Sequence, residues 1–266
     1  MENRLIKVEQ VGFVTKVLLN NKSKKNALDN ELIKEIVITL DELNKNNSCR
    51  VVLLGSTSNV FCSGGDVKAM MNKDEMFEGG SIDLRNQYHF GIQEMSRAME
   101  RFKKPIIAVI DGACVGAGAD LACMCDLRVG SENLKFSETF SNLALVPGDG
   151  GTFFVPRVLG YAKAMELYLT ARTVKAEEAQ KIGLINFLYD HSLLWKNALE
   201  LAVGISEKPP VSIEMTKQAL KEAHQNRNLE TNLNLLSAFQ AITQLSNDHQ
   251  KGLKSLKEGK QIFEGN

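Results

Sequence analysis

The sequence predicts an α/β fold that ends in a helical part. Short apolar runs rich in β-branched residues, such as 50–55 and 106–110, alternate with helical patterns up to about residue 190. Only helical patterns follow, so we expect two parts, 1–190 and 191–266. With 266 residues, of which 44% are hydrophobic, the chain can bury the large core that this fold needs.

The first elements are predicted from alternation and helix capping. Residues 4–10 and 13–19 alternate polar and apolar side chains around Gly12, which favours a hairpin. Asp29 can cap a helix that runs to about Leu43, because apolar residues recur in this stretch at helical spacing.

Two glycine-containing turns are the strongest candidates for a functional site. Each lies between a strand and a helix, at 61–67, where Asp66 caps the helix, and at 112–118, where the helix begins near Gly118 or Ala119. Small residues let a substrate approach the backbone, and N–H groups at a helix start carry a partial positive charge. Two such N–H groups that converge could stabilise the oxyanion of a thioester.

The remaining elements follow from helical spacing and from glycine and proline breaks. Residues 73–86 are charged and weakly patterned, which predicts a mobile loop. Residues 148–152 form a glycine-rich turn that contains one carboxylate, Asp149. A strand is expected at 126–130, and helices are expected at 87–102, 156–169, 175–182, 193–207, 211–226, 229–245 and 248–257.

Composition argues against several classes of function. The formal net charge is zero, so only the basic patch 22–25 would suggest nucleic-acid binding, and a membrane partner is not favoured. No apolar run reaches the roughly 18–20 residues of a membrane span, and the N-terminus resembles neither a signal nor a transit peptide. The five cysteines form an odd set, and Cys123 and Cys125 lack a second ligand pair. We therefore expect reduced thiols, no metal site and a cytoplasmic location.

A series of short motifs follows one another over nearly the whole chain. They are N-A-L at 26–28, F-C-S-G-G-D at 61–66, the stretch 105–126, V-P-G-D-G-G-T at 146–152, P-R-V-L-G at 156–160, A-E-E-A at 176–179 and G-L-I at 183–185. In this order they resemble the crotonase, or enoyl-CoA hydratase/isomerase, superfamily. The resemblance implies a spiral of ββα turns, a helical C-terminal trimerisation region, and trimers that often pair into hexamers. It also implies an acyl-CoA thioester as the substrate, with coenzyme A as part of that substrate and no separate cofactor.

The resemblance also implies the roles of individual residues. The backbone N–H groups of Gly65 and Ala117 would form the oxyanion hole, in a substrate pocket with Val115, Gly116 and Phe140. The residues implied for CoA binding are Lys24, Asn26, Ala27, Leu28, Ser63, Gly64, Asp66 and Lys68, together with Lys260 and Phe263, which would reach the CoA of a neighbouring subunit.

The chain departs from the hydratase pattern at both positions where hydratases of this family have glutamate. The first is Asp120, whose carboxylate is one methylene shorter, and the second is Phe140, which cannot move protons. Hydration of a conjugated double bond needs one group that activates the water and another that transfers the α-proton. Three alternatives are open: Asp120 acts with Asp149 as the pair, Glu138 folds into the site, or Asp120 or Asp149 alone moves one proton in an isomerisation.

Two similarities favour isomerisation. Ring-modifying isomerases of aromatic catabolism that resemble this chain have Phe at the same place and an Asp one residue before Asp149, and dienoyl-CoA isomerases have Asp where Asp120 stands. Each carboxylate also has a purely structural interpretation. Asp149 would accept hydrogen bonds from turn amides, and Asp120 would complement the helix dipole. Glu138 is expected to face solvent or to be paired. The sequence thus predicts an enzyme that shifts or hydrates a double bond of an enoyl-CoA, with a CoA-binding scaffold as the rival.

Overall fold

Successive strands of the chain alternate between two sheets, and this alternation produces the ββα spiral. The computed structural model describes residues 4–226 and 228–265. In this part of the chain, the larger sheet has the order β1-β2-β3-β5-β7-β10. Its strands are β1 (Ile6–Val11), β2 (Val14–Leu19), β3 (Val51–Ser56), β5 (Ile106–Ile110), β7 (Leu127–Ser131) and β10 (Phe187–Tyr189). The smaller sheet, in the order β4-β6-β8-β9, contains β4 (Val60–Cys62), β6 (Ala113–Val115), β8 (Lys135–Ser137) and β9 (Val174–Lys175).

Each spiral turn contributes one strand to each sheet. β3 is followed by β4, β5 by β6 and β7 by β8, and the neighbours within each sheet pair in parallel. Only β1 with β2 and β8 with β9 pair antiparallel in the described part of the chain. The hairpin predicted around Gly12 is therefore confirmed, and so is the ββα spiral.

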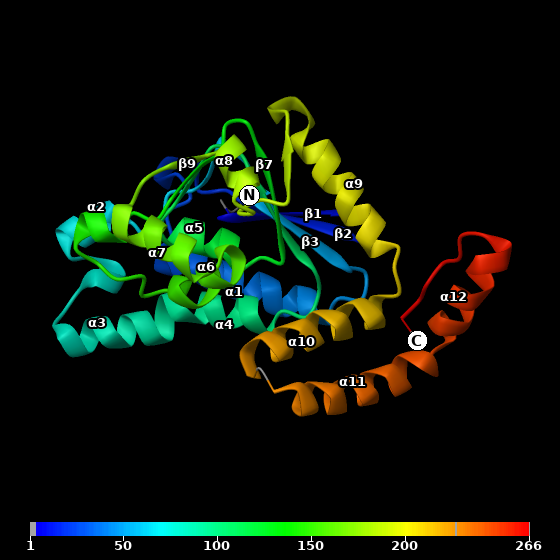
Figure 1. Cartoon of the computed structure of the whole chain (residues 1–266). Coiled ribbons are helices and arrows are strands. Elements are labelled where there is room, and N and C mark those ends of the chain that lie inside the picture. Colours follow the sequence, from blue (N-terminus) through cyan, green and yellow to red (C-terminus); the bar gives the residue numbers. More distant parts are fainter. Residues whose placement is uncertain (1–3, 227, 266) are drawn as a thin grey trace.

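The helices cover both faces of the larger sheet (Figure 1). The first part of the chain contains α1 (Asn30–Lys45), α2 (Val67–Asn72), α3 (Ser81–Gln87), the π-helical turn η3 (Tyr88–Ile92), α4 (Gln93–Arg101), α5 (Ala117–Cys123), α6 (Gly151–Leu159), α7 (Tyr161–Thr170) and α8 (Ala176–Lys181). Short 3-10 turns lie at Lys22–Lys24, Glu75–Phe77, Phe140–Leu143 and His191–Leu193. The cap predicted for the first helix is confirmed, because the Asp29 carboxylate accepts a hydrogen bond from the Leu32 N–H.

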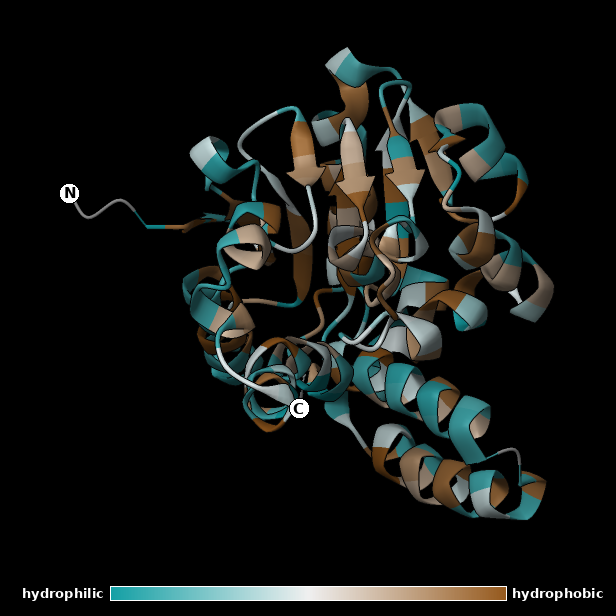
Figure 2. Ribbon diagram, turned by 90° about the vertical axis from the view of Figure 1, so that its left-hand side faces the viewer, coloured by the Kyte–Doolittle hydropathy of each residue, from teal (hydrophilic) through white to brown (hydrophobic). Residues whose placement is uncertain are grey.

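Apolar burial explains why these strands and helices pack together. Figure 2 shows the strands coloured mainly as hydrophobic, and β3 and β5 are buried along almost their whole length. One core cluster joins α1, α4 and α5 to the sheets, and a second lies between the larger sheet and α9 (Leu194–Ser206). Gly55 on β3 leaves the space that the Trp195 ring of α9 fills. Thus α9, although it follows residue 190, packs on the sheet.

The C-terminal helices lie at the opposite end of the molecule from α2 and α3 (Figure 1). They are α10 (Pro210–Asn226), α11 (Leu229–Gln244) and α12 (Asn247–Glu258). The last described residues fold back, because the Asp248 carboxylate accepts hydrogen bonds from the Glu264 and Gly265 N–H groups. Arg50 adds a hydrogen bond to the Phe263 carbonyl oxygen at 2.7 Å.

Three predicted segments differ from the structure. The expected loop 73–86 contains the 3-10 turn Glu75–Phe77 and all of α3 except its last residue, because α3 has little apolar periodicity to reveal it. The expected helix 156–169 is two helices, and the first begins at Gly151, so Pro156 lies inside it. The small-residue turn 112–118 contains β6, because Ala113 and Val115 pair with β8. No helix among the described residues combines the length and apolar composition that a membrane crossing requires.

Candidate active site

The two glycine turns predicted from the sequence lie against each other. A Cβ on Gly64 would lie 2.7 Å from the Val115 carbonyl oxygen and 3.5 Å from the Ala117 nitrogen. Gly64 has a φ of 91° and Gly116 a φ of 51°, a region that glycine occupies readily. A side chain on Gly118 would also collide with Cys62, so α5 packs directly on the end of β4. Glycines thus bring the starts of α2 and α5 together.

The backbone N–H groups of Gly65 and Ala117 are available to a ligand. Within the described residues, neither N–H donates a hydrogen bond to the protein. Both residues line the same pocket, which is open to solvent on one side. Ala117 is also the first residue of α5, where the partial positive charge of a helix start reinforces its N–H. The arrangement suits an oxygen that gains negative charge.

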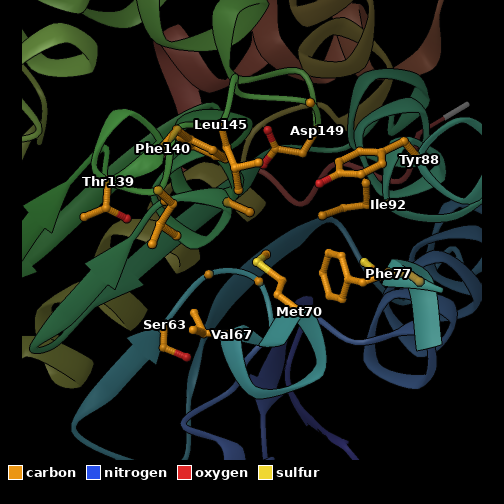
Figure 3. Close-up of a pocket in the computed structure, with 17 residues that line it drawn as sticks. Ser63, Val67, Met70, Phe77, Tyr88, Ile92, Thr139, Phe140, Leu145 and Asp149 are labelled. Carbon is orange, nitrogen blue, oxygen red and sulfur yellow. The ribbon is translucent and has the colours of Figure 1, made fainter. Parts of the chain in front are cut away.

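Figure 3 shows the pocket between two groups of apolar side chains. Phe77 points into it from one side, and Phe140 and Leu145 approach from another. The predicted pocket residues Gly116 and Phe140 line it, but Val115 of β6 does not, because its carbonyl packs against Gly64 instead. The residues that line the pocket are Ser63, Gly64, Gly65, Val67, Met70, Met76, Phe77, Tyr88, Ile92, Gly116, Ala117, Thr139, Phe140, Leu143, Leu145, Gly148 and Asp149.

Asp149 is the carboxylate that faces this pocket (Figure 3). Its turn is held by one helical segment: Gln93 donates to the Gly148 carbonyl at 2.8 Å, and Ser96 donates to the carbonyl of Asp149 itself. The Tyr88 ring packs against Gly148, where a Cβ would lie 2.7 Å from a ring carbon. Burial raises the pKa of Asp149 above its ordinary value, because the charged form loses its hydration.

Asp120, the other carboxylate assigned to catalysis, lies behind Asp149. It is fully buried and does not line the pocket. Tyr168 donates a hydrogen bond to its Oδ1 at 2.7 Å, and Gly151 leaves the space that its carboxyl occupies. Burial, followed by the charges of Asp149 and Glu138, raises its pKa well above the ordinary value. Asp120 thus lies in the buried cluster beside Asp149, and its catalytic role stays a prediction.

Glu138 was expected to face solvent or to be paired, and this prediction is wrong. Its side chain is fully buried, and neither carboxylate oxygen has a hydrogen-bond partner among the described residues. Its carboxyl interacts electrostatically with those of Asp120 and Asp149, which are also buried. Burial and then the Asp149 charge raise the pKa of Glu138 well above 4.5. Three buried carboxyl groups so close together disfavour one another's ionisation.

The buried carboxyls predict a pH-dependent stability. A carboxyl with a raised folded-state pKa keeps its proton while the unfolded chain loses it, so the free energy of unfolding falls as pH rises above about 4.5. Glu138→Gln removes the contribution of Glu138 to this effect, while Asp120 and Asp149 keep theirs. We expect it to raise the free energy of unfolding by about 1–2 kcal/mol at pH 8, and by much less at pH 4, in urea titrations.

The matched control is Glu42→Gln, which alters an exposed glutamate of α1. It should leave the stability unchanged at both pH values. A Glu138→Gln variant that is less stable than the wild type at pH 8 would show that Glu138 is ionised and stabilised by a partner.

Several residues implied for CoA binding have their side chains committed within the protein. Lys24 forms ion pairs with the carboxylates of Asp29, Asp66 and Glu75, and Asp66 also caps α2. The Asn26 amide donates to Ser56 and to the carbonyls of Val60 and Phe61. Ala27 and Leu28 are buried. These contacts hold the shape of the loop beside the pocket.

The other residues implied for CoA binding differ in position. Ser63 and Gly64 line the pocket, and Lys68 is exposed on α2. Lys260 is paired with Glu207, and Phe263 accepts a hydrogen bond from Arg50. The C-terminal segment lies far from α2 within this chain (Figure 1). Its contact with CoA would therefore require a second subunit.

Sequence reasoning missed Tyr88, Gln93, Ser96 and Tyr168. The first three lie on one helical segment and meet the Asp149 turn because the π-helical turn η3 sets their direction, which no local pattern predicts. Tyr168 lay within a predicted helix, but only its contact with Asp120 gives it a role.

A ββα spiral with two free N–H groups over an apolar pocket, and a buried carboxyl in its wall, defines a protein of the crotonase fold. The enoyl-CoA hydratase/isomerase family model matches residues 9–266, and the chain belongs to this family. It is 32% identical to a short-chain-enoyl-CoA hydratase of Clostridium acetobutylicum over 91% of this chain and 88% of that protein. It is 31% identical to the 1,2-epoxyphenylacetyl-CoA isomerase of Escherichia coli over 96% of this chain and 95% of that protein. A crystal structure of an enoyl-CoA hydratase from Bacillus anthracis superposes with a TM-score of 0.92 at 29% identity, covering 99% of this chain and all of that one.

Proposed function

We propose that the protein is an enoyl-CoA isomerase in which Asp149 moves a proton along the acyl chain. One observation supports this choice above the others: among the described residues that line the pocket, Asp149 is the only carboxylate. A single acid–base group is enough to shift a double bond, whereas hydration needs a second group to manage the attacking water. The second glutamate of hydratases is replaced by Phe140, and Asp120 and Glu138 lie outside the pocket.

The proposed reaction begins with the thioester oxygen bound between the Gly65 and Ala117 N–H groups. The Asp149 carboxylate removes a proton from the α-carbon of a 3-enoyl-CoA, and the electron pair moves onto the thioester oxygen. Each N–H group stabilises the resulting dienolate by roughly 3 kcal/mol. Protonated Asp149 then gives the proton to the γ-carbon, which leaves a conjugated 2-enoyl-CoA. Asp120 acts as a positioning residue, held by Tyr168 behind Asp149.

A comparison of two substrates tests the proposal. With 3-hexenoyl-CoA we expect conversion to the 2-enoyl thioester, followed by the rise in ultraviolet absorbance of the conjugated product. With crotonyl-CoA we expect a kcat/KM for hydration that is lower by about 100-fold or more, because the pocket lacks the second group. Hydration that is as fast as isomerisation would make the protein a hydratase, and turnover of neither thioester would favour a CoA-binding scaffold.

We also propose that the chain works as a homotrimer or a dimer of trimers, with no cofactor apart from the CoA of its substrate. The exposed apolar side chains of Leu220 on α10 and of Leu233 and Leu236 on α11 support an assembly through the C-terminal helices. In such an assembly, Lys260 and Phe263 would approach the CoA of a neighbouring subunit.

A further inference from the structure

We infer that the acyl group taken by this pocket is neutral and apolar, and that the pocket excludes acyl groups that end in a carboxylate. This inference rests on the proposed function, because it assumes that the thioester oxygen binds Gly65 and Ala117. From that point the acyl chain has to run along the remaining wall of the pocket. The chemistry of that wall therefore decides which acyl groups fit.

The wall beside the oxyanion site is made of apolar side chains. The terminal methyl of Met70 reaches the Cα side of Gly65, where a Cβ would lie only 2.8 Å from it, and the Phe77 ring lies 4.0 Å from the same point. Tyr88 and Ile92 continue the wall along η3 (Figure 3). An acyl chain that leaves the thioester thus contacts methyl, thioether and ring carbons, which bind apolar groups by excluding water.

No positive charge balances an anionic acyl group there. Among the described residues that line the pocket, none is a lysine, an arginine or a histidine. Lys24 lies nearby, but its ammonium group already pairs with Asp29, Asp66 and Glu75. An unpaired carboxylate moved from water into an apolar wall loses its hydration without compensation.

The charges behind the pocket add to this exclusion. Asp149 faces the acyl group directly, and Asp120 and Glu138 lie behind it in the same buried cluster. Any ionised member of the cluster repels a second carboxylate, and burial of the cluster weakens the screening of this repulsion. The pocket therefore selects against dicarboxylic acyl groups both by its wall and by its charge.

Binding of two unreactive thioesters tests this selectivity without relying on catalysis. Hexanoyl-CoA and adipoyl-CoA have the same chain length and differ in a terminal carboxylate. We expect the Kd of adipoyl-CoA, measured by titration calorimetry at pH 7.5, to be higher by about 50-fold. Equal affinities within threefold would overturn the inference. Because neither thioester reacts, failure of the isomerase proposal in the substrate comparison would leave this result interpretable.

A charge introduced at the pocket mouth provides a second test. Val67 lines the pocket and is 46% exposed, so a longer side chain can be accommodated there. Val67→Arg should reduce the ratio of the two Kd values about tenfold, because the guanidinium can pair with the terminal carboxylate. Val67→Met, of similar length and without charge, should leave the ratio unchanged. Attraction of the guanidinium to the CoA phosphates would lower both Kd values equally and leave their ratio unchanged. An unchanged ratio in the arginine variant would therefore mean that the terminal carboxylate is not near this wall, which would count against the inference.

Discussion

Asp149→Asn is expected to lower kcat for 3-hexenoyl-CoA by about 1000-fold, because the amide cannot accept the α-proton. The loss should appear mainly in kcat, since the N–H groups of Gly65 and Ala117, which we propose bind the thioester oxygen, remain in place. In the wild type, burial raises the pKa of Asp149 above 3.8, so kcat/KM should rise with pH through a pKa above that value. This rise should disappear in the variant. Steady-state kinetics between pH 5 and 8 measure both effects.

The matched control is Asp120→Asn, which alters the carboxyl that lies behind the pocket. This variant keeps Asp149, the proposed acid–base group, and still offers an amide oxygen to the Tyr168 hydroxyl. We expect a loss of about tenfold, as for a positioning residue. An Asp120→Asn variant as inactive as Asp149→Asn would show that both carboxyls act directly, which would support the paired alternative and hydration.

Ala117→Pro is the second large effect that we expect, and it tests the oxyanion hole. A backbone N–H can be deleted only by proline, and a proline is tolerated at the first position of a helix, where Ala117 lies. The preceding Gly116 has no Cβ to clash with the proline ring. Removing one of two donors should lower kcat roughly 100- to 1000-fold.

Two controls accompany this variant. Ala117→Ser adds bulk at the same position but keeps the N–H, so it should retain at least about a third of the wild-type kcat. Circular dichroism and thermal unfolding establish that the proline variant is folded. A folded Ala117→Pro enzyme with nearly full activity would mean that the thioester oxygen binds elsewhere.

Local sequence patterns predicted the structure correctly wherever neighbouring residues alone determine it. The cap at Asp29 and the start of α5 require only neighbouring residues, and both lie where the pattern predicted them, within a residue. The pairing of the two glycine turns was also accessible, since strand, turn and helix recur in the same order at Gly65 and Ala117. The motif series then extended these local signals to the family.

Contacts between distant segments could not be predicted in this way. Glu138 follows a short strand, and nothing nearby in the sequence indicates that Asp120 and Asp149 enclose it. A charged residue is ordinarily exposed, so the local prediction was the reverse of what tertiary packing imposes. Tyr88 is comparable, because its position over Gly148 depends on a π-helical turn.

The space beside Gly151 has a consequence for redesign. A Cβ on Gly151 would collide with the Asp120 carboxyl, so the helix start of α6 already fits tightly around a side chain of aspartate length. Installing the two glutamates of a hydratase, through Asp120→Glu and Phe140→Glu, would press an extra methylene against that backbone. A variant with both hydratase glutamates would therefore also need changes in α6.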